Sequence, residues 1–291
     1  MTRALPRRVD AWGAAKVNIG WRVGSARPDG YHEVCGLLHT ISLTDYLEIV
    51  ADDEGGDLPV RVVVPGHSAL EGPVNLVAQA AAVLAERCKP RPTTIVVHKS
   101  IPIAAGLGGG SADAAAALVG LNTLWGAGRS ARDLLRIGAD VGSDVPGVLL
   151  GGLVHVSGRG EVVRNVGGAS AGWFVLGVGD EHLATADAYA ALDDIRRGDD
   201  GPSGVTSWHA NELEAAACSL VGDLGRRLDA MRRAAGVAFV AGSGPTVVGV
   251  AADEAHARDV VARVRDTFTD VLVAQPIDWG VRVKVGKATL N

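Results

Sequence analysis

The segment IPIAAGLGGGSADAAAALVGLNTLW, residues 101–125, constrains the fold of this chain more than any other stretch. Its glycine-rich run, GLGGGS (106–111), leads directly into an alanine-rich stretch that is typical of a helix. Glycines let a backbone approach an anion closely, and a helix N-terminus offers unpaired N–H donors with partial positive charge. The segment therefore predicts an anion-binding loop at the start of a helix. The alternative is a plain strand-to-helix turn, for which one or two glycines suffice.

This loop matches neither of two common phosphate-binding patterns. No Gly-Lys-Ser/Thr follows it, as a P-loop requires, and its glycines lack the G-x-G-x-x-G spacing of dinucleotide-binding folds. Two side chains are open to more than one interpretation. Ser111 caps the helix or orients a metal or a phosphate oxygen, and Asp113 in the first turn favours the helix dipole or helps to hold Mg²⁺.

Composition and charge exclude several classes of protein. Of the 291 residues, 47% are hydrophobic and 21% are charged, which is the balance of a globular protein with a large core. The net charge of −5 argues against nucleic acid as the main partner. No N-terminal signal peptide is evident, and no run of about 18 apolar residues is free of charge or glycine. We expect a cytoplasmic protein with no membrane partner.

Two scarce residue types add detail. The cysteines Cys35, Cys88 and Cys218 are odd in number and far apart, so we expect buried, inert thiols and neither a disulfide framework nor a zinc site. Only five of the 28 basic residues are lysines. In a chain so biased toward arginine, Lys16 and Lys99 indicate a need for a compact ammonium, unless they are ordinary surface charges.

The pattern of apolar residues predicts an α+β chain in two domains, residues 1–152 and 153–291, divided at Gly151–Gly152. Strands are expected at 16–23, 35–51, 58–65, 93–102, 173–178, 237–240, 246–250 and 270–275, with a hairpin at 153–166 and a loop at 52–57. Helices are expected at 75–88, from 111, at 130–139, 185–197, 207–221, 223–235 and 254–268, with a short apolar helix or strand before residue 152.

Three motifs together resemble the GHMP kinase superfamily. GAAKVNIGWRV (13–23) is similar to its first motif, PIAAGLGGGSADAAAAL (102–118) to its second and VAGSGPTVVGV (240–250) to its third, in the family's order. The resemblance covers nearly the whole chain. It implies an N-terminal ribosomal protein S5 domain 2-like ATP-binding domain and a C-terminal ferredoxin-like α/β sandwich. The loop GSGP (242–245), by itself a hairpin turn, would then border the active site and support the phosphate loop.

A narrower resemblance, to the 4-diphosphocytidyl-2-C-methyl-D-erythritol kinase family, rests on DGYHE (29–33), GSDVP (142–146) and NELE (211–214). It implies ATP-dependent phosphorylation of the 2-hydroxyl of that cytidine diphosphate alcohol, in the non-mevalonate synthesis of isoprenoid precursors. The chain departs from the family pattern at Gly13-Ala14, where Ala-Pro is usual. A proline there would only stiffen the chain, so the departure does not affect the implied chemistry.

The resemblance also implies roles for individual residues. Asp144 corresponds to the catalytic aspartate and Lys16 to its partner lysine, so that Asp144 accepts or orients the hydroxyl proton while Lys16 stabilises the carboxylate. The acceptor is expected to contact Asn18, Tyr31, His32, Lys99, Asp144, Thr185 and Tyr189, with the cytosine base between the two tyrosines and His32 at its edge. ATP, with Mg²⁺ bridging its phosphates, is expected to contact Lys99, Pro102, Ala104, Ala105, Gly106, Leu107, Gly108, Gly109, Gly110, Ser111 and Asp113.

Simpler interpretations stay open for several of these residues. Asp144 precedes Val-Pro and suits a helix N-cap, and capping and catalysis can coexist. Tyr31 suits a turn tyrosine that packs on the core, His32 a surface histidine and Tyr189 the apolar face of its helix. Two other functions also fit the pattern: another GHMP kinase, of homoserine or mevalonate type, or a non-catalytic ligand-binding homologue. The sequence predicts a monomer or a weak homodimer and does not identify metal ligands.

Overall fold

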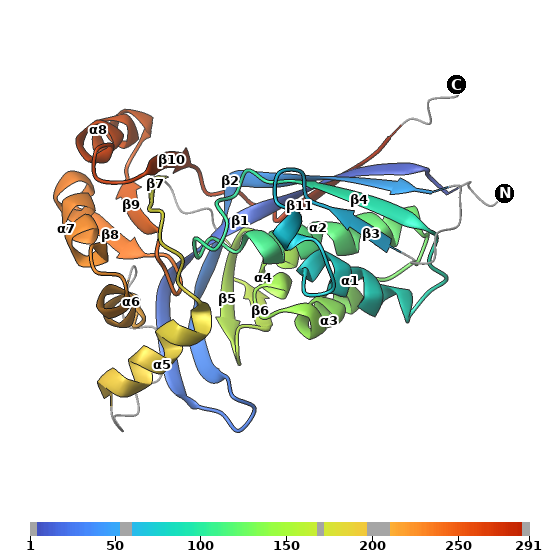
Figure 1. The fold of residues 1–291 in the computed structure, drawn as a ribbon, viewed down its shortest axis with the longest axis horizontal. Coiled ribbons are helices and arrows are strands. Elements are labelled where there is room, and N and C mark those ends of the chain that lie inside the picture. Colours follow the sequence, from blue (N-terminus) through green and yellow to red (C-terminus); the bar gives the residue numbers. More distant parts are fainter. Residues whose placement is uncertain (1–4, 53–59, 168–171, 197–209, 287–291) are drawn as a thin grey trace.

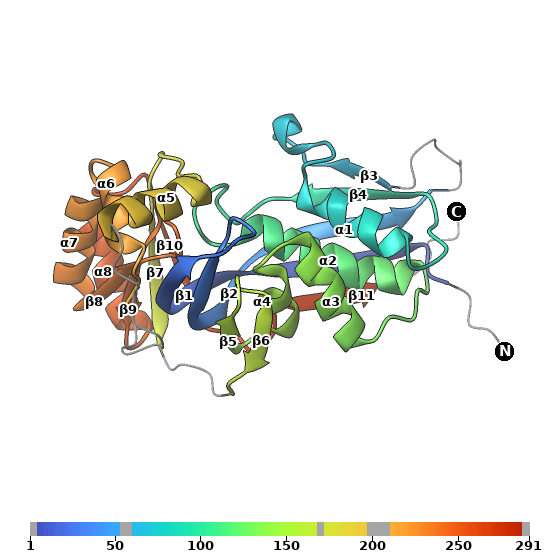
Figure 2. The same ribbon diagram turned by 90° about the horizontal axis from the view of Figure 1, so that it is seen from below.

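The computed structural model describes residues 5–52, 60–167, 172–196 and 210–286. Two sheets form two lobes that lie side by side, each with helices packed against it (Figures 1 and 2). The larger sheet has seven strands in the order β11-β1-β2-β4-β3, with β5 paired to β2 and β6 paired to β5. These strands are β1 (Arg8–Ala26), β2 (His32–Ala51), β3 (Val60–Val63), β4 (Thr93–His98), β5 (Leu153–Ser157), β6 (Val162–Asn165) and β11 (Val281–Val285).

The long hairpin of β1 and β2 links the two lobes. The Pro28-Asp29-Gly30 turn closes it, and its antiparallel register runs from Arg8↔Val50 to Ala26↔His32. One end of the hairpin lies in the seven-stranded sheet, and the other reaches the second lobe, where Trp21 bridges to Asn211 (Figure 1). Residues at the middle of β1 therefore lie between the lobes.

Four helices and a short 3-10 turn accompany the seven-stranded sheet. They are η1 (Ser68–Leu70), α1 (Leu76–Ala85), α2 (Gly109–Leu124), α3 (Ala131–Val141) and α4 (Val145–Leu150). The alanines of α2 are buried, and a Cβ on Gly13 of β1 would lie only 2.2 Å from the Ala112 carbonyl oxygen. Small side chains are therefore what lets α2 lie directly on the sheet, in the main core.

The smaller lobe has a four-stranded antiparallel sheet in the order β10-β7-β9-β8. Its elements are β7 (Trp173–Val178), α5 (Thr185–Arg196), α6 (Glu214–Leu220), α7 (Leu224–Ala235), β8 (Val237–Val240), β9 (Val247–Ala251), α8 (Glu254–Val264) and β10 (Asp270–Ala274). Helices α7 and α8 bury their apolar faces, including Met231 and Val260, in a separate core with Val175 and Phe268. Helices α5 and α6 lie toward the β1–β2 hairpin (Figure 1).

Most predicted elements are confirmed within two or three residues. The hairpin at 153–166 is β5 and β6, and the ambiguous apolar segment before residue 152 is the helix α4. The expected helix at 207–221 is too long: residues 207–209 lie outside the described ranges, residues 210–213 form a bridge to β1 and a turn, and the helix α6 begins only at Glu214. Most of the expected loop at 52–57 also lies outside the described ranges. The β1 strand begins eight residues earlier than expected, and β11 was not predicted.

The predicted division at residue 152 does not separate the two sheets. Strand β5 begins at Leu153 and pairs with β2, His39 opposite Leu153, so that β5 and β6 belong to the larger sheet. Strand β11, near the end of the chain, returns to pair with β1. The reason is that Gly151 and Gly152 do not form a linker: they turn the chain from α4 back onto β2.

Two expectations from composition have clear outcomes. Cys35, Cys88 and Cys218 are all free but half-buried, where full burial was expected, and burial raises the pKa of the Cys88 and Cys218 thiols. Among the described residues, no helix is both long enough and apolar enough to cross a membrane.

Candidate active site

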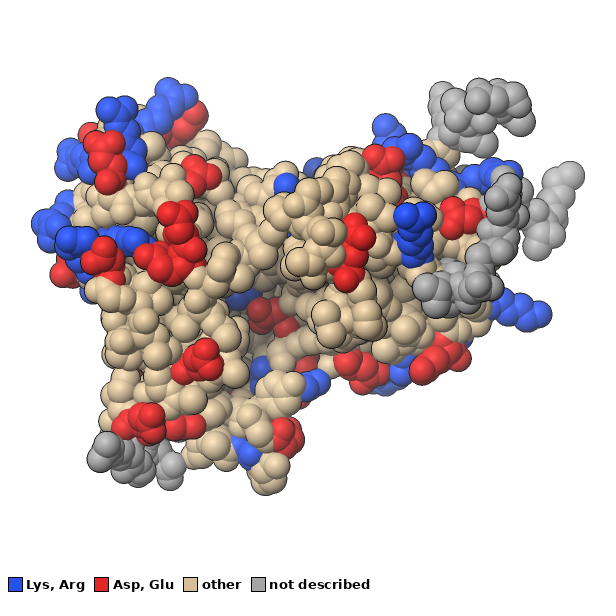
Figure 3. Space-filling view, in the orientation of Figure 1, with Lys and Arg blue, Asp and Glu red and all other residues tan. Residues whose placement is uncertain are grey.

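A cavity of about 900 Å³ lies between the lobes and is lined by residues from both. The space-filling view shows the corresponding hollow on this face, with acidic and basic side chains at its base (Figure 3). Its walls come from the middle of β1, the turn before β2, the glycine loop and α2, the segment 142–144, helix α5 and the loop after β8. Every residue predicted to bind substrate or nucleotide lines this cavity: Lys16, Asn18, Tyr31, His32, Lys99, Pro102, Ala104, Ala105, Gly106, Leu107, Gly108, Gly109, Gly110, Ser111, Asp113, Asp144, Thr185 and Tyr189.

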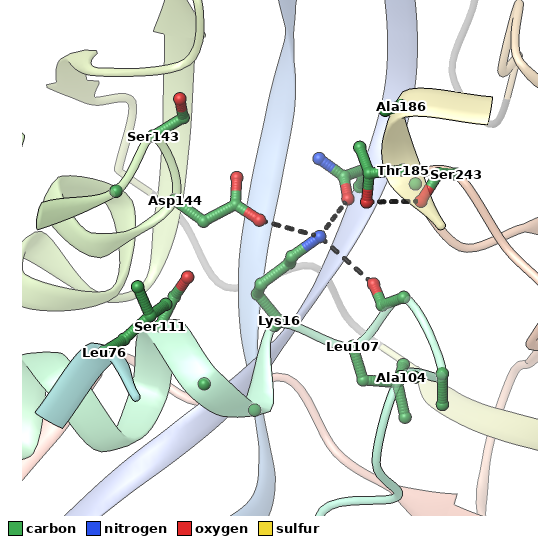
Figure 4. Close-up of a pocket in the computed structure, with 18 of the residues that line it drawn as sticks. Lys16, Leu76, Ala104, Leu107, Ser111, Ser143, Asp144, Thr185, Ala186 and Ser243 are labelled. Carbon is green, nitrogen blue, oxygen red and sulfur yellow. Dashed lines mark hydrogen bonds and ion pairs between the residues drawn. The ribbon is translucent and has the colours of Figure 1, made fainter. Parts of the chain in front are cut away.

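Lys16 lies at the base of the cavity and is almost fully buried. Its Nζ donates to Asn18 Oδ1 at 2.7 Å and to the Gly106 carbonyl oxygen at 3.1 Å, and lies 3.1 Å from Asp144 Oδ2 (Figure 4). Three acceptors therefore satisfy the three ammonium protons. Lys16 is thus an interior residue, and the surface-charge alternative is wrong.

Asp144 faces Lys16 across the cavity from the N-terminus of α4 (Figure 4). It occupies the N-cap position, but its side chain makes no capping hydrogen bond. The carboxylate side chain is 29% exposed, and among the described residues only its Oδ2 has an ion-pair partner. An ionised carboxylate held open to a cavity beside an ammonium can accept a proton from a bound hydroxyl group.

The glycine loop passes directly over Lys16. A Cβ on Gly108, which has φ +71°, would lie 2.8 Å from Cγ and Cε of Lys16, so glycine is the residue that fits this close approach. Gly106, at φ +79°, faces the third glycine-rich segment, where a Cβ would lie 2.8 Å from the Gly244 carbonyl oxygen. The loop is therefore packed between β1 and the loop after β8. The loop GSGP (242–245) was predicted to border the active site, and two of its residues, Gly242 and Ser243, line the cavity.

The predicted helix start at Ser111 is wrong by two residues. Gly108 is the N-cap in a left-handed conformation, and helix α2 already begins at Gly109. Because the loop itself forms the first turn, Ser111 is helical and its hydroxyl is not the cap (Figure 4). The structure thus places free backbone N–H groups and a hydroxyl at the positive end of a 16-residue helix.

The second lysine, Lys99, belongs to a closed cluster beneath the glycine loop. Its Nζ lies 2.5 Å from Asp45 Oδ2 and 2.6 Å from Asp113 Oδ2. Asp45 Oδ1 also accepts the N–H groups of Ser100 and Ile101, just before the loop. The cluster therefore connects β2, the segment that enters the loop and the helix that leaves it.

Asp113 is not in the first turn of α2, so its predicted dipole role is wrong. Burial, together with the Asp45 carboxylate and against the attraction of Lys99, raises the pKa of Asp113 to about 8. The same two carboxylates raise the pKa of Lys99 despite its burial. Among the described residues, Asp113 Oδ1 is buried without a hydrogen-bond partner.

Aromatic side chains gather at the other end of the cavity. The rings of His32 and Tyr189 lie 5.0 Å apart, Trp21 Nε1 donates to the Tyr189 hydroxyl at 3.3 Å, and His32 Nε2 lies 2.9 Å from Asp193 Oδ1. Burial raises the pKa of the Tyr189 phenol to about 12. Tyr31 is 48% exposed, so it does not pack on the core as a turn tyrosine would. These rings form an open-sided site that suits a flat base.

Thr185 and Ser243 connect the aromatic end with the third glycine-rich segment. Thr185 Oγ1, at the start of α5, lies 3.2 Å from Ser243 Oγ, on the side of the cavity toward which Lys16 points (Figure 4). Asn18 Oδ1 accepts from Lys16, which leaves its amide N–H donors for a ligand.

Several cavity or cluster residues were not predicted from the sequence: Trp21, Asp45, Arg159 and Asp193. Only Asp45 carries a sequence signal that could have been read, because it is in phase with Ile41, Leu43, Leu47 and Ile49 on an otherwise apolar face of its strand. Trp21, Arg159 and Asp193 come from three separate elements, and nothing in their local sequence places them together.

The fold and this site define a class of protein, the ATP-dependent small-molecule kinases of the GHMP type. Residues 75–152 match the family model described as GHMP kinases N terminal domain, and residues 206–270 match GHMP kinases C terminal. A solved homoserine kinase from Cytophaga hutchinsonii shares the fold, with TM-score 0.73, 17% identity and coverage of 98% of this chain and 99% of that one. The predicted α+β, two-domain GHMP kinase fold is therefore confirmed.

More similar relatives narrow the class. The 4-diphosphocytidyl-2-C-methyl-D-erythritol kinase of Moorella thermoacetica is 35% identical over 281 residues, covering 90% of this chain and 96% of its own. That of Mycobacterium avium is 38% identical, covering 86% and 84%. A crystal structure of 4-(cytidine 5'-diphospho)-2C-methyl-D-erythritol kinase has TM-score 0.73 at 28% identity, covering 91% and 98%. This chain belongs to the 4-diphosphocytidyl-2-C-methyl-D-erythritol kinase family.

Proposed function

We propose that this enzyme transfers the γ-phosphoryl group of ATP to the 2-hydroxyl of 4-diphosphocytidyl-2-C-methyl-D-erythritol, in the non-mevalonate synthesis of isoprenoid precursors. The observation that carries the proposal is the pair of Lys16 Nζ and Asp144 Oδ2, 3.1 Å apart at the base of a cavity that the glycine loop borders. The named relatives support the choice of acceptor, and the aromatic end of the cavity suits a pyrimidine base.

The donor nucleotide binds along the glycine loop. Free N–H groups at the start of α2, on residues 109–111, point their partial positive charge toward the phosphates. The residues predicted to contact ATP line the cavity from Pro102 to Asp113, and the same wall continues to Lys99.

Mg²⁺ is a predicted cofactor, and the residues present fit a metal that is held mainly by the nucleotide. Among the described residues no three His, Cys, Asp or Glu side chains are grouped as a metal cage. Asp113 is not suited to the role, because one of its oxygens is bound to Lys99 and the other is sealed from solvent. Ser111 lines the cavity and would contribute its hydroxyl. Mg²⁺ supplies charge neutralisation on the phosphate oxygens, which is how kinases generally use it.

The acceptor binds with its base at the aromatic end and its alcohol beside Asp144. Tyr31 and Tyr189 flank the base, His32 meets its edge, and Asn18 and Thr185 contact the part of the acceptor that lies nearer Lys16. Stacking of this kind is worth about 1–3 kcal/mol per base in nucleic-acid complexes.

In the transfer step, Asp144 accepts or orients the proton of the 2-hydroxyl, and that oxygen attacks the γ-phosphorus. The bond from the γ-phosphorus to the bridging oxygen of ADP breaks, and ADP leaves. Lys16 keeps the Asp144 carboxylate in place and, through the Gly106 carbonyl, ties it to the loop that holds the phosphates. Positioning and charge stabilisation of this type account for most phosphoryl-transfer catalysis.

A panel of alcohols tests the proposal against its rivals. The purified enzyme with ATP and Mg²⁺ should release ADP with 4-diphosphocytidyl-2-C-methyl-D-erythritol at least about 100-fold faster, in kcat/KM, than with homoserine or mevalonate, because buried polar groups strongly discriminate between acceptors. Preference for either other alcohol would identify another GHMP kinase. Tight ATP binding with no ADP release on any alcohol would identify a non-catalytic homologue. The cytoplasmic location and the monomeric or weakly dimeric state stay predictions.

A further inference from the structure

The cations that line the cavity differ in whether a carboxylate already neutralises them. Lys16 is paired with Asp144, and Lys99 is paired with both Asp45 and Asp113. Arg159 also lines the cavity, yet within the described part of the chain it forms no ion pair. Its positive charge is therefore free for an anionic ligand.

Arg159 is also held in a defined position. It lies in the turn between β5 and β6, and its Nη2 donates to the Ala139 carbonyl oxygen at 2.8 Å in the last turn of α3. Its guanidinium carbon lies 4.8 Å from the centre of the Tyr31 ring. A guanidinium has five N–H donors in a rigid plane, so this anchoring leaves donors on Nε and Nη1 for a ligand.

The carboxylates that line the cavity do not take up these donors. Asp144 is paired with Lys16, Asp113 with Lys99, and Asp193 with His32. The acceptor of the proposed reaction carries a diphosphate directly attached to its cytidine. If Tyr31 stacks on the base, the neighbouring guanidinium is close to that diphosphate, and the planar fork of arginine fits phosphate oxygens well.

We propose that Arg159 is a specificity residue that binds the diphosphate of the cytidine diphosphate acceptor while its guanidinium packs on the Tyr31 ring. This inference rests on the proposed function, since it needs an acceptor with a cytidine next to a diphosphate. It assigns to one side chain the recognition of the acceptor's anionic centre, whereas Lys16 and Lys99 are committed to their own carboxylates.

Calorimetric binding of CDP and of cytidine tests the inference, with the donor site saturated by a non-hydrolysable ATP analogue. Arg159→Gln should raise the Kd for CDP by about tenfold, because charge-assisted hydrogen bonds are lost, and should change the Kd for cytidine by less than about threefold. Raising the salt concentration should weaken CDP binding more in the wild type than in the variant. Arg159→Lys should give an intermediate Kd, since it keeps the charge and loses the fork.

Arg164→Gln on β6 is the matched control, because it removes an exposed arginine that does not line the cavity, and its Kd for CDP should equal that of the wild type. An unchanged Kd for CDP in Arg159→Gln overturns the inference. Equal losses for CDP and cytidine also overturn it, because Arg159 would then only brace Tyr31. If Arg159→Gln unfolds, Arg159→Lys replaces it in the test. A larger rise in the Kd for CDP than in the Kd for cytidine then supports the inference, and equal changes in the two Kd values overturn it. Failure of the proposed function is a separate result: the wild type would not phosphorylate the cytidylyl acceptor.

Discussion

Two lysine–carboxylate clusters flank the same glycine loop, and they differ in their access to solvent. Lys16 forms an ion pair with Asp144, whose side chain is 29% exposed. In the other cluster the side chains of Lys99, Asp45 and Asp113 are 9%, 0% and 8% exposed. The first cluster keeps a carboxylate partly open to the cavity, whereas the carboxyl groups of the second are almost fully buried.

The difference indicates two uses of the same ion pair. A carboxylate that stays partly open can meet a substrate hydroxyl, and its partner lysine holds it in place. A cluster whose carboxyl groups are almost fully buried offers little of them to a substrate, although Lys99 and Asp113 line the cavity wall. It can hold the two ends of the loop together, because Lys99 before the loop binds Asp113 after it, and Asp45 accepts the N–H groups of Ser100 and Ile101. Breaking a buried pair by removing one partner is costly, so the closed cluster should matter for stability and the open one for chemistry.

The largest expected effect is on turnover. Asp144→Asn should lower kcat by about 10²–10⁴-fold, because the variant lacks the carboxylate that we propose accepts or orients the hydroxyl proton. The melting temperature should change by no more than a few degrees, since the Asp144 side chain does not cap α4. Steady-state kinetics and thermal unfolding of the same preparation check both parts. Unchanged turnover would remove the contrast between the clusters, because the open carboxylate would have no chemical role.

The next effect is on stability. Lys99→Met leaves the buried Asp45 carboxylate without its cation, and removes the hydrogen-bond donor of Asp113, so it should lower the free energy of unfolding by about 3–5 kcal/mol. Lys16→Met should have a smaller effect on unfolding, because Asp144 keeps contact with solvent. Urea denaturation measures both, with the exposed Lys89→Met as a control expected within about 0.5 kcal/mol of the wild type. Equal losses at Lys16 and Lys99 would contradict the division into an open and a closed cluster.

A third effect is the pH dependence of stability. The folded protein keeps the proton of Asp113 up to about pH 8, whereas an unperturbed aspartate has a pKa of 3.8, so this group lowers the free energy of unfolding as the pH rises between these values. Asp113→Asn has no titrating group at this position. Its free energy of unfolding should therefore rise relative to that of the wild type between pH 5 and pH 8, as measured by urea denaturation at several pH values. The exposed Asp266→Asn is the control. Parallel curves for Asp113→Asn and wild type would show that Asp113 is ionised throughout.

Much of the fold could be predicted because its signals are local. The alternation of KVNIGWRV and the spacing of NLVAQAAAVLAERC specify a strand and a helix whatever surrounds them. The edge strand β11 was missed because all but its first residue are exposed, so it lacks a buried face to give the pattern. The division at residue 152 does not coincide with the boundary between the sheets, because a pair of glycines fits a linker and a tight turn equally well, and only the pairing of Leu153 with His39 decides between them.

The candidate site was predicted less evenly. Lys16, Asp144 and the glycine loop were found through motifs, each of which is contiguous in the sequence. The burial and ion pairing of Lys99 and Asp113 were not predicted, because they depend on Asp45, which lies more than 50 residues away from Lys99 in the chain. Arg159 was missed for the same reason. Its position becomes informative only from its contact with the Tyr31 ring, and Tyr31 lies far from it in the sequence.

The sequence by itself determined the kind of loop and the order of most elements, because glycine content and apolar periodicity act over a few residues. The tertiary structure alone decided which lysine has an open carboxylate, which is sealed, and which cation of the cavity has no ion-pair partner in the described chain. The physical reason is that burial and ion pairing depend on distances across the fold, and those distances exist only when the two lobes have packed.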